Sequence, residues 1–334
     1  MQFAVIGGGS IGKRHVGNLL TRGIDPSAIT VVDPRADRRE ECVTRFGVNV
    51  AETAEALEAL SLTGAFICSP TAMHVQHAVP LAKRGIHLLI EKPLDASLAG
   101  AAALAEAAEE GGAKILVGYC FRFSLHVRKL KELVDAGVIG RPLYVRGEFS
   151  EYLPDWHPYE DYRSFYMAKR DQGGGSLLDQ SHIMDMVAWL FGQPDRIFAF
   201  NGAVSDLETD VDDMAEATLF YDSGLIASVH QDMFGRAHRK TLEVKGTLGN
   251  LEWNAYDLSV SHYDAASKTT KTYHTPKDYQ IMYLNELDHF LALCSDPAVA
   301  PAVTLQEGIE GMQVIDAILK SNKTGALVAV AETP

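Results

Sequence analysis

Cysteine is scarce in this sequence, and its spacing excludes the sites that cysteine most often builds. The 334 residues include four cysteines that stand far apart and form no Cys-x-x-Cys or Cys-x-x-His unit, namely Cys42, Cys68, Cys120 and Cys294. Structural zinc sites and disulfide frameworks require closely spaced or regularly paired cysteines. We therefore expect no cysteine-built metal site, and reduced thiols in a cytoplasmic protein.

Positive charge and long apolar runs are also lacking. Lys and Arg number 30 against 44 Asp and Glu, which gives a net charge of −14. Nucleic-acid binding draws on clustered Lys and Arg, so DNA and RNA are poor partners. No apolar run approaches the roughly 20 residues of a membrane span, and we expect the segment "MQFAVI" to be a strand and not part of a signal peptide. These absences favour a cytoplasmic protein without a membrane partner.

The length predicts two domains at roughly 150 residues each. In residues 1–120, apolar runs of strand length alternate with helical patterns, which predicts an α/β Rossmann domain with a parallel sheet covered on both faces. The expected strands of this domain are Phe3–Ile6, Ile29–Val32, Ala65–Cys68, His87–Ile90 and Ile115–Val117.

Residues 121–334 have a different pattern, typical of an α+β domain. Successive strand-like runs joined by short turns such as "YDSG" and "GTLGN" predict a mostly antiparallel, open-faced sheet. Because open apolar faces usually pair, we expect a homodimer or homotetramer through this sheet. The expected strands are Leu143–Phe149, Ile197–Val204, Met214–Tyr221, Leu225–Gln231, Thr241–Lys245 and Leu258–His262, and the expected helices are Ser176–Phe191, Leu284–Cys294 and Leu305–Lys320.

The stretch "AVIGGGSIGKRH" carries the glycine fingerprint of a dinucleotide-binding turn. Gly7 permits the turn, Gly9 lets the backbone approach a pyrophosphate, and Gly12 allows close packing of helix and strand. Amides of the new helix, from Ser10 and Ile11, would face the phosphates. Asp33 ends the next strand about 20 residues after Gly12, where a carboxylate holds the ribose hydroxyls of NAD.

Asp33 would repel the 2′-phosphate of NADP, so NAD is the favoured cofactor. Arg35, Arg38 and Arg39 follow, however, and a guanidinium binds phosphate in a bidentate manner, which leaves NADP possible. The alternative interpretation of the three arginines is a solvated helix face.

Two further strand ends should lie at the ligand edge of the parallel sheet. In such sheets, ligands bind outside the carboxyl ends of the strands. Ser69, Pro70 and His74 in "CSPTAMH" are expected near the cofactor, as are Glu91 and Lys92 in "IEKPL".

We expect these strand ends to meet "GGGSLLDQSHIMD" in a cleft between the domains. On a single helix, Asp179 and His182 would project from nearly the same face. An imidazole beside a carboxylate is a reasonable general base, and a lysine at a strand end could donate a hydrogen bond to a developing alkoxide. Lys92, His182 and Asp179 thus meet the needs of hydride transfer to NAD. In the alternative interpretation, His182 bonds locally to Asp179 or Asp185, and Lys92 is a surface residue paired with Glu91. A further alternative is that Asp179, His182 and Asp185 bind a metal.

The irregular stretch 151–172 is long and aromatic, which is typical of a lid or binding loop. Its aromatic residues could stack on a sugar, while His157 and Arg163 could hold a carboxylate or phosphate. The alternative is that the aromatic residues only fasten the loop to the domain. These aromatic residues are Tyr152, Trp156, Tyr162 and Tyr166.

Taken in order, these motifs resemble the glucose-fructose oxidoreductase, inositol dehydrogenase and rhizopine-catabolism (Gfo/Idh/MocA) family. The resemblance rests on "VIGGGSIGKRH", "CSPTAMH", "EKPL", "GYCFRF", "GGGSLLDQSHIMD" and "LEVKGTLGNLEW", which span nearly the whole chain. It implies an NAD(P)-dependent dehydrogenase or reductase acting on a sugar, inositol or nucleotide-sugar derivative.

The resemblance also implies roles for individual residues. Lys92 matches the catalytic lysine, His182 the acid/base histidine, Asp179 a substrate-binding acid, and Arg122 an arginine near the site. Family members commonly place three residues between the Asp and the His, whereas "DQSH" has two. The aromatic loop resembles a branch that accompanies nonulosonic-acid or nucleotide-sugar pathways.

Two other functions fit the same motifs. A cofactor-binding regulator or sensor could keep the fold without the chemistry, because fold does not imply function. An enzyme with tightly held NAD could use transient oxidation to drive elimination or glycoside cleavage.

Overall fold

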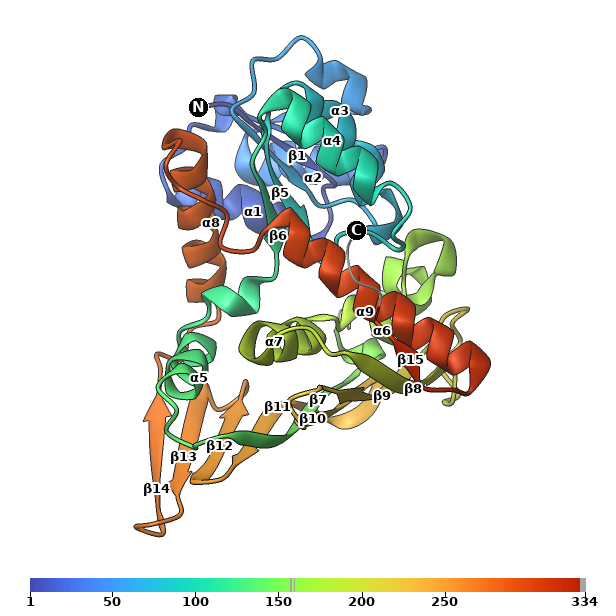
Figure 1. The fold of residues 1–334 in the computed structure, drawn as a ribbon. Helices are drawn as coiled ribbons and strands as arrows, with labels where there is room; N and C mark the ends of the chain where they lie inside the picture. Colours follow the sequence, from blue (N-terminus) through green and yellow to red (C-terminus); the bar gives the residue numbers. More distant parts are fainter. Residues whose placement is uncertain (157, 159, 331–334) are drawn as a thin grey trace. The chain divides into compact units, whose positions relative to one another are not determined.

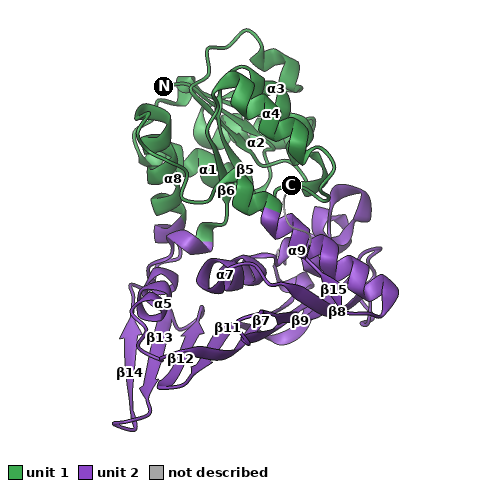
Figure 2. Ribbon diagram, viewed as in Figure 1, with its two compact units in different colours: residues 1–120, 283–309 green, residues 121–282, 310–334 purple. Residues whose placement is uncertain are grey.

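The computed structural model describes residues 1–156, 158 and 160–330, so His157 lies outside the described residues. The chain forms two compact units (Figure 2). Unit 1 contains residues 1–120 and 283–309, and unit 2 contains residues 121–282 and 310–334. The chain changes unit at residue 120, where the expected first domain ends, but residues 283–309 group with unit 1 although the sequence assigns them to the second domain.

Two contacts explain why the segment 283–309 belongs to unit 1. Phe290 packs edge-on against Phe66 in the parallel sheet, with ring centroids 4.9 Å apart. The amide of Val117 donates to the carbonyl oxygen of Val303 at 3.1 Å, beside the edge strand of that sheet.

Unit 1 contains a six-stranded parallel sheet in the order β3-β2-β1-β4-β5-β6. Figure 1 labels its strands β1, β5 and β6. Strands such as β1 are buried along their whole length, which explains their continuous apolar sequences. The strand order reverses between β1 and β4, the position at which such sheets bind ligands. The strands are β1 (Phe3–Ile6), β2 (Ile29–Val32), β3 (Asn49–Ala51), β4 (Gly64–Ile67), β5 (His87–Glu91) and β6 (Ile115–Gly118), and the helices are α1 (Ser10–Thr21), α2 (Ala36–Phe46), α3 (His74–Lys83), α4 (Ala101–Gly111) and α8 (Gln280–Ser295), which begins in unit 2.

Unit 2 contains a nine-stranded sheet in the order β14-β13-β12-β11-β7-β10-β9-β8-β15. Within the described chain, the β7–β10 pair is parallel and the other neighbours are antiparallel. The sheet is therefore mostly antiparallel, as the sequence predicts. Its strands are β7 (Pro142–Tyr152), β8 (Arg196–Gly202), β9 (Met214–Phe220), β10 (Ile226–Asp232), β11 (Phe234–Gly246), β12 (Gly249–Asn254), β13 (Ser259–Asp264), β14 (Thr269–His274) and β15 (Val328–Ala329).

Burial alternates along these strands, so one face of the sheet is covered and the other is open. In β9 the side chains of Ala215, Ala217 and Leu219 are buried while their neighbours are partly exposed. Helix α7 (His182–Phe191) lies on the covered face (Figure 1). A Cβ atom on Gly147 of β7 would lie 2.8 Å from Cγ1 of Ile183, so the glycine permits this close packing. Helix α5 (Leu125–Asp135) also belongs to unit 2, and helix α9 (Leu305–Thr324) begins in unit 1 and continues in unit 2.

The single helix predicted over Ser176–Phe191 is wrong. The chain forms a short helix, α6 (Ser176–Asp179), followed by α7. Between them, the amides of Ser181 and Ile183 bond three residues back, to the carbonyl oxygens of Leu178 and Gln180, instead of four. The buried side chain of Gln180 donates to the carbonyl oxygen of Asp232 at 2.7 Å, which anchors this break to the sheet.

Along the described part of the chain, every helix is too short or too polar to pass through a lipid bilayer.

Candidate active site

The glycine turn after β1 has the geometry that a dinucleotide requires. Gly7 has φ +104°, and a Cβ atom there would lie 2.2 Å from the carbonyl oxygen of Cys68. A Cβ atom on Gly12 would lie 1.9 Å from the carbonyl oxygen of Gly7. The nearest atom to a Cβ on Gly9 is Nη1 of Arg38, at 3.9 Å. The fold itself thus requires Gly7 and Gly12, whereas Gly9 leaves space above the first amides of α1, those of Ser10 and Ile11.

Asp33 is fixed at the end of β2. Its side chain is 2% exposed, and its carboxylate accepts the amide of Gly8 at 2.8 Å and that of Arg35 at 2.9 Å. The carboxylate therefore joins the glycine turn to the start of the segment that leads into α2. A dinucleotide bound across this turn would meet both the helix amides and this acid, so the residues present fit the cofactor.

The arginines after Asp33 have partners within the protein. Arg35 lies on the surface in a two-bond pair with Asp37, with Nε–Oδ1 and Nη2–Oδ2 distances of 3.0 and 2.5 Å, and these bonds lower the pKa of Asp37 to about 2. Arg39 donates to the backbone carbonyl oxygens of Asp33 and Pro34 at 2.7 and 2.8 Å. Arg38 lies close to the cradle formed by Gly7, Gly9 and Asp33, with its Nη1 3.4 Å from Oδ2 of Asp33. Of the three guanidiniums, that of Arg38 is the best placed to meet a ribose phosphate.

His74 connects the two loops that follow β4 and β5. Its ring is 2% exposed, with Nδ1 3.0 Å from the carbonyl oxygen of Pro93 and Nε2 2.9 Å from that of Ser69. Burial lowers the pKa of His74, while the two carbonyl oxygens act in the opposite direction, because only the protonated ring donates from both nitrogens. Because both nitrogens face backbone carbonyls, His74 supports the loops of Ser69 and Lys92 and does not present a free nitrogen to the cofactor.

A second tie between the same loops comes from Asp95. Its carboxylate accepts the amide of Val75 at 2.9 Å and that of Ala96 at 2.7 Å. Together with His74, it fixes the partly buried segment that carries Lys92 directly after β5.

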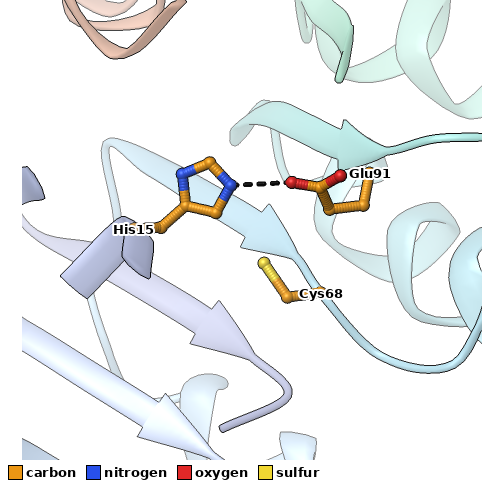
Figure 3. Close-up of side chains that lie close together, drawn as sticks. All are labelled: His15, Cys68 and Glu91. Carbon is orange, nitrogen blue, oxygen red and sulfur yellow. Dashed lines mark hydrogen bonds and ion pairs between the residues drawn. The ribbon is translucent and has the colours of Figure 1, made fainter. Parts of the chain in front are cut away.

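Glu91, the residue before Lys92, is held by a buried histidine (Figure 3). Nε2 of His15 lies 2.8 Å from Oε1 of Glu91, and Cys68 completes a group whose donor atoms all lie within 4.8 Å of one another. The contact uses the imidazole nitrogen and the carboxylate oxygen that would face a metal ion. The arrangement is therefore explained as a hydrogen-bonded pair that anchors α1 to the end of β5.

In unit 2, the predicted acid and base lie on two consecutive helices, and each has a close partner. Asp179 ends α6 and is 8% exposed, and its Oδ1 accepts the hydroxyl of Tyr166 at 2.7 Å. His182 begins α7, is 8% exposed and stacks on Phe121, with ring centroids 4.3 Å apart and an interplanar angle of 13°. Neither partner is predicted from the sequence, which assigns Tyr166 to sugar stacking or to fastening the loop and gives Phe121 no role.

Arg122 lies in a buried ion pair with Asp185. Nε and Nη2 of Arg122 donate to the two carboxylate oxygens at 3.0 and 2.6 Å, and both side chains are 5% exposed. Arg122 therefore positions the first turn of α7, where His182 stands, through two hydrogen bonds to the Asp185 carboxylate.

The aromatic residues of the loop 151–172 fasten it to unit 2. A buried cluster formed by the loop with Met233 is covered by three of the predicted sugar-stacking residues, Trp156, Tyr162 and Tyr166. Arg163 is exposed and pairs with Asp161 at 2.9 Å and with Glu208 at 2.5 Å. These contacts favour the fastening role, which is the alternative to sugar stacking.

Comparison with known proteins gives two family matches. The model described as "Oxidoreductase family, NAD-binding Rossmann fold" matches residues 1–119, and the model "GFO/IDH/MocA C-terminal domain" matches residues 127–252. The D-xylose 1-dehydrogenase (NADP(+)) 2 of Haloferax volcanii is 31% identical over 339 residues, covering 98% of this chain and 99% of the relative. The myo-inositol 2-dehydrogenase of Thermotoga maritima is 28% identical and covers 92% of each chain.

Solved structures show the same fold over the whole chain. Levoglucosan dehydrogenase in complex with NADH and levoglucosan superposes with a TM-score of 0.86 at 20% identity, covering 99% of this chain and 100% of the other. The WlbA dehydrogenase from Bordetella pertussis, in complex with NADH and UDP-GlcNAcA, superposes with a TM-score of 0.84 at 19% identity, covering 100% and 98%. At these identities the likeness shows the fold alone.

Proposed function

Because this chain belongs to the Gfo/Idh/MocA family of NAD(P)-dependent oxidoreductases, we propose that it transfers a hydride between NAD and a secondary alcohol or ketone of a sugar, inositol or nucleotide-sugar derivative. The observation that carries the cofactor half of the proposal is the cradle of Gly7, Gly9 and Asp33. It combines two glycines that the backbone or a ligand requires with a fixed, buried carboxylate at the end of β2. The relatives' names support the substrate class.

The proposed reaction needs only a few groups from the protein. The bound nicotinamide would supply the carbon that exchanges hydride with the substrate. In the oxidative direction, His182 accepts the hydroxyl proton as the carbon–hydrogen bond of the alcohol breaks, leaving a ketone. Lys92 donates a hydrogen bond to the oxygen on which negative charge develops. Asp179 accepts a hydrogen bond from a substrate hydroxyl and so orients the reacting carbon.

The anchoring contacts support these roles. Stacking on Phe121 restricts rotation of the His182 ring, and the His74 and Asp95 contacts restrict the loop that carries Lys92. Groups held in one geometry lose little entropy in the transition state, which is one contribution that a protein makes to a hydride transfer.

The experiment is to follow NADH and NADPH absorbance with a panel of pentoses and hexoses, inositols, anhydrosugars, uronates and UDP-sugars. We expect turnover with one class, a preference for NAD, and a loss of about 100-fold or more in Lys92→Ala and His182→Asn. Lys83→Ala is the matched control, because this lysine is exposed at the end of α3 and pairs with Glu110. Silence across the panel, with NAD binding shown by fluorescence, would argue against the proposed substrate class.

The same assay separates a net dehydrogenase from an enzyme that keeps its NAD. A dehydrogenase releases NADH in proportion to the oxidised substrate. An oxidation-elimination enzyme gives a product with no net NADH, because the same cofactor is reoxidised in each cycle.

A homo-oligomer formed through the open face of the unit 2 sheet is part of the proposal. Phe198, Phe200 and Ile226 point to this face and are 49%, 47% and 39% exposed. Apolar side chains gathered on one sheet face favour pairing with a second copy. We expect light scattering to give a dimer or tetramer for the wild type and a smaller species for Phe198→Glu. A monomeric wild type would contradict this.

A further inference from the structure

A hydrogen bond between Tyr166 and Asp179 links the aromatic loop to one of the candidate catalytic groups. The Tyr166 hydroxyl donates to Oδ1 of Asp179 at 2.7 Å, and the carboxylate is 8% exposed. A hydrogen bond from a hydroxyl to a carboxylate is short and about twice as strong as a neutral one. It therefore selects one orientation of a side chain whose terminal torsion is otherwise broad.

Tyr166 is itself held in place by the glycines that precede Asp179. A Cβ atom on Gly174 would lie 2.4 Å from the carbonyl oxygen of Met167 and 2.5 Å from that of Tyr166. The amide of Gly175 donates to the carbonyl oxygen of Met167 at 2.9 Å. The turn that bears Tyr166 thus packs against the "GGG" run directly before α6. The last glycine of this run, Gly175, stands four residues before Asp179.

The other side of α6 is equally constrained. Asp212 accepts the hydroxyl of Ser176 at 2.7 Å and the amide of Leu177 at 2.9 Å, which fixes the first residues of the helix. Tyr166 packs against the buried cluster of Leu153, Phe165, Met167, Ala168 and Met233. Both partners of the hydrogen bond consequently stand on rigid supports, and the bond transmits the position of the loop to the carboxylate.

We propose that Tyr166 is a positioning residue that orients the Asp179 carboxylate toward a substrate hydroxyl, so that the aromatic loop acts through Asp179 and not by stacking on the sugar. This inference rests on the proposed role of Asp179. It explains why the long loop is built as it is, because the aromatic residues fasten the loop while one of its hydroxyls reaches the site.

The test is a double-mutant cycle of Tyr166→Phe and Asp179→Asn, assayed on the substrate found in the panel. Tyr166→Phe should lower kcat/KM about 10- to 100-fold, mainly through kcat, because a displaced orienting group costs transition-state alignment. In the Asp179→Asn background the same change should have less than about a twofold further effect. Tyr279→Phe is the matched control, since it removes another tyrosine hydroxyl that donates a hydrogen bond, to the carbonyl oxygen of Ala255 at 2.5 Å and outside the loop 151–172, and it should leave kcat/KM unchanged.

Two results would overturn the inference: wild-type kcat/KM in Tyr166→Phe, or an equal loss in both backgrounds, which would show a role unconnected with Asp179. Melting temperatures of all variants separate unfolding from repositioning. If the wild type turns over nothing, the proposed function fails, and crystal structures of Tyr166→Phe and Tyr279→Phe decide the positioning role alone. A carboxylate of Asp179 that rotates in the first variant but not in the second supports that role, and an unmoved carboxylate contradicts it.

Discussion

Arg122 and Asp185 form a two-bond ion pair inside unit 2, with Nε–Oδ2 and Nη2–Oδ1 distances of 3.0 and 2.6 Å and both side chains 5% exposed. The pair joins the turn Cys120–Phe123 to the first turn of α7. Phe121 directly precedes Arg122, and His182 stands three residues before Asp185 in α7. The rings of Phe121 and His182 stack on each other. One salt bridge and one ring stack thus position the proposed base through the same two segments.

Breaking this pair should destabilise the protein strongly. Asp185→Leu removes the carboxylate that accepts two hydrogen bonds from the buried Arg122 guanidinium, and we expect a loss of about 3–5 kcal/mol in the free energy of unfolding. The double variant Arg122→Met with Asp185→Leu should recover most of that loss, because both charges of the pair are removed together. Urea denaturation measures both. If the loss of unfolding free energy in the double variant equals the sum of the losses in the two single variants, Arg122 and Asp185 do not stabilise each other and the prediction is wrong.

Gly9 and Gly12 should respond differently to the same added methyl group. A Cβ atom on Gly12 would overlap the carbonyl oxygen of Gly7 at 1.9 Å, whereas a Cβ on Gly9 has no atom nearer than 3.9 Å. We expect Gly12→Ala to lower the melting temperature by about 5 °C or more, in line with a loss of about 2 kcal/mol from a strained close contact. Gly9→Ala should keep the wild-type melting temperature and weaken NAD binding about tenfold or more, because the methyl group occupies the space of the pyrophosphate. Equal NAD affinity in Gly9→Ala and wild type, measured by calorimetry, would refute this assignment.

How far the sequence predicts the fold depends on burial. The buried parallel strands of unit 1 have continuous apolar runs, so the expected ranges agree with β1, β2, β4, β5 and β6 within a residue or two. Strand β14, "TTKTYH", is exposed along nearly all of its length and has no apolar alternation, so the pattern does not predict it. Part of β12 falls in the predicted turn "GTLGN", since two glycines in five residues are typical of a turn.

The candidate site divides in the same way. The position of Lys92 follows from a local rule, because a residue directly after a parallel strand lies at the ligand edge. The tertiary partners do not follow from local rules: Tyr166 reaches Asp179 over 13 residues, and Arg122 reaches Asp185 over 63. The break after α6 is not predictable either, since the polar pair Gln180–Ser181 does not interrupt the helical pattern of apolar residues.

Glu286 should make the protein less stable as the pH rises. It is 1% exposed, and neither carboxyl oxygen has a hydrogen-bond partner in the described part of the chain. Burial, and then the charge of Glu91, raise the pKa of Glu286 well above its ordinary value of 4.5. The folded state therefore holds a proton that the unfolded state releases, so its contribution to stability falls as the pH rises above 4.5 toward the folded pKa.

Glu286→Gln tests this, because glutamine has the same shape and never ionises. Relative to the wild type, we expect this variant to gain about 1 kcal/mol or more of unfolding free energy between about pH 5 and pH 8. The exposed Glu106→Gln serves as the control and should show no such gain. Parallel stability–pH curves for Glu286→Gln and the wild type would exclude a raised pKa at this position.

His230 should stabilise unit 2 below pH 9. Its Nε2 lies 2.8 Å from Asp232 and its Nδ1 lies 2.7 Å from Glu216, and these two bonds raise the pKa of His230 to about 9. Since the unfolded pKa is 6.5, the stabilisation is fully present below pH 6.5 and is lost as the pH rises through about 9. The rise in the pKa of His230 corresponds to at most about 3 kcal/mol of unfolding free energy, and we expect about 1–2 kcal/mol because the Glu216 side chain is 42% exposed and screened by solvent.

His230→Gln should therefore have an unfolding free energy about 1–2 kcal/mol below that of the wild type at pH 6, with the difference vanishing by about pH 10. Urea unfolding at four pH values measures this difference, and His274→Gln on β14 serves as the control. A difference in unfolding free energy that stays constant from pH 6 to pH 10 would show that the variant loses packing and not a charge interaction.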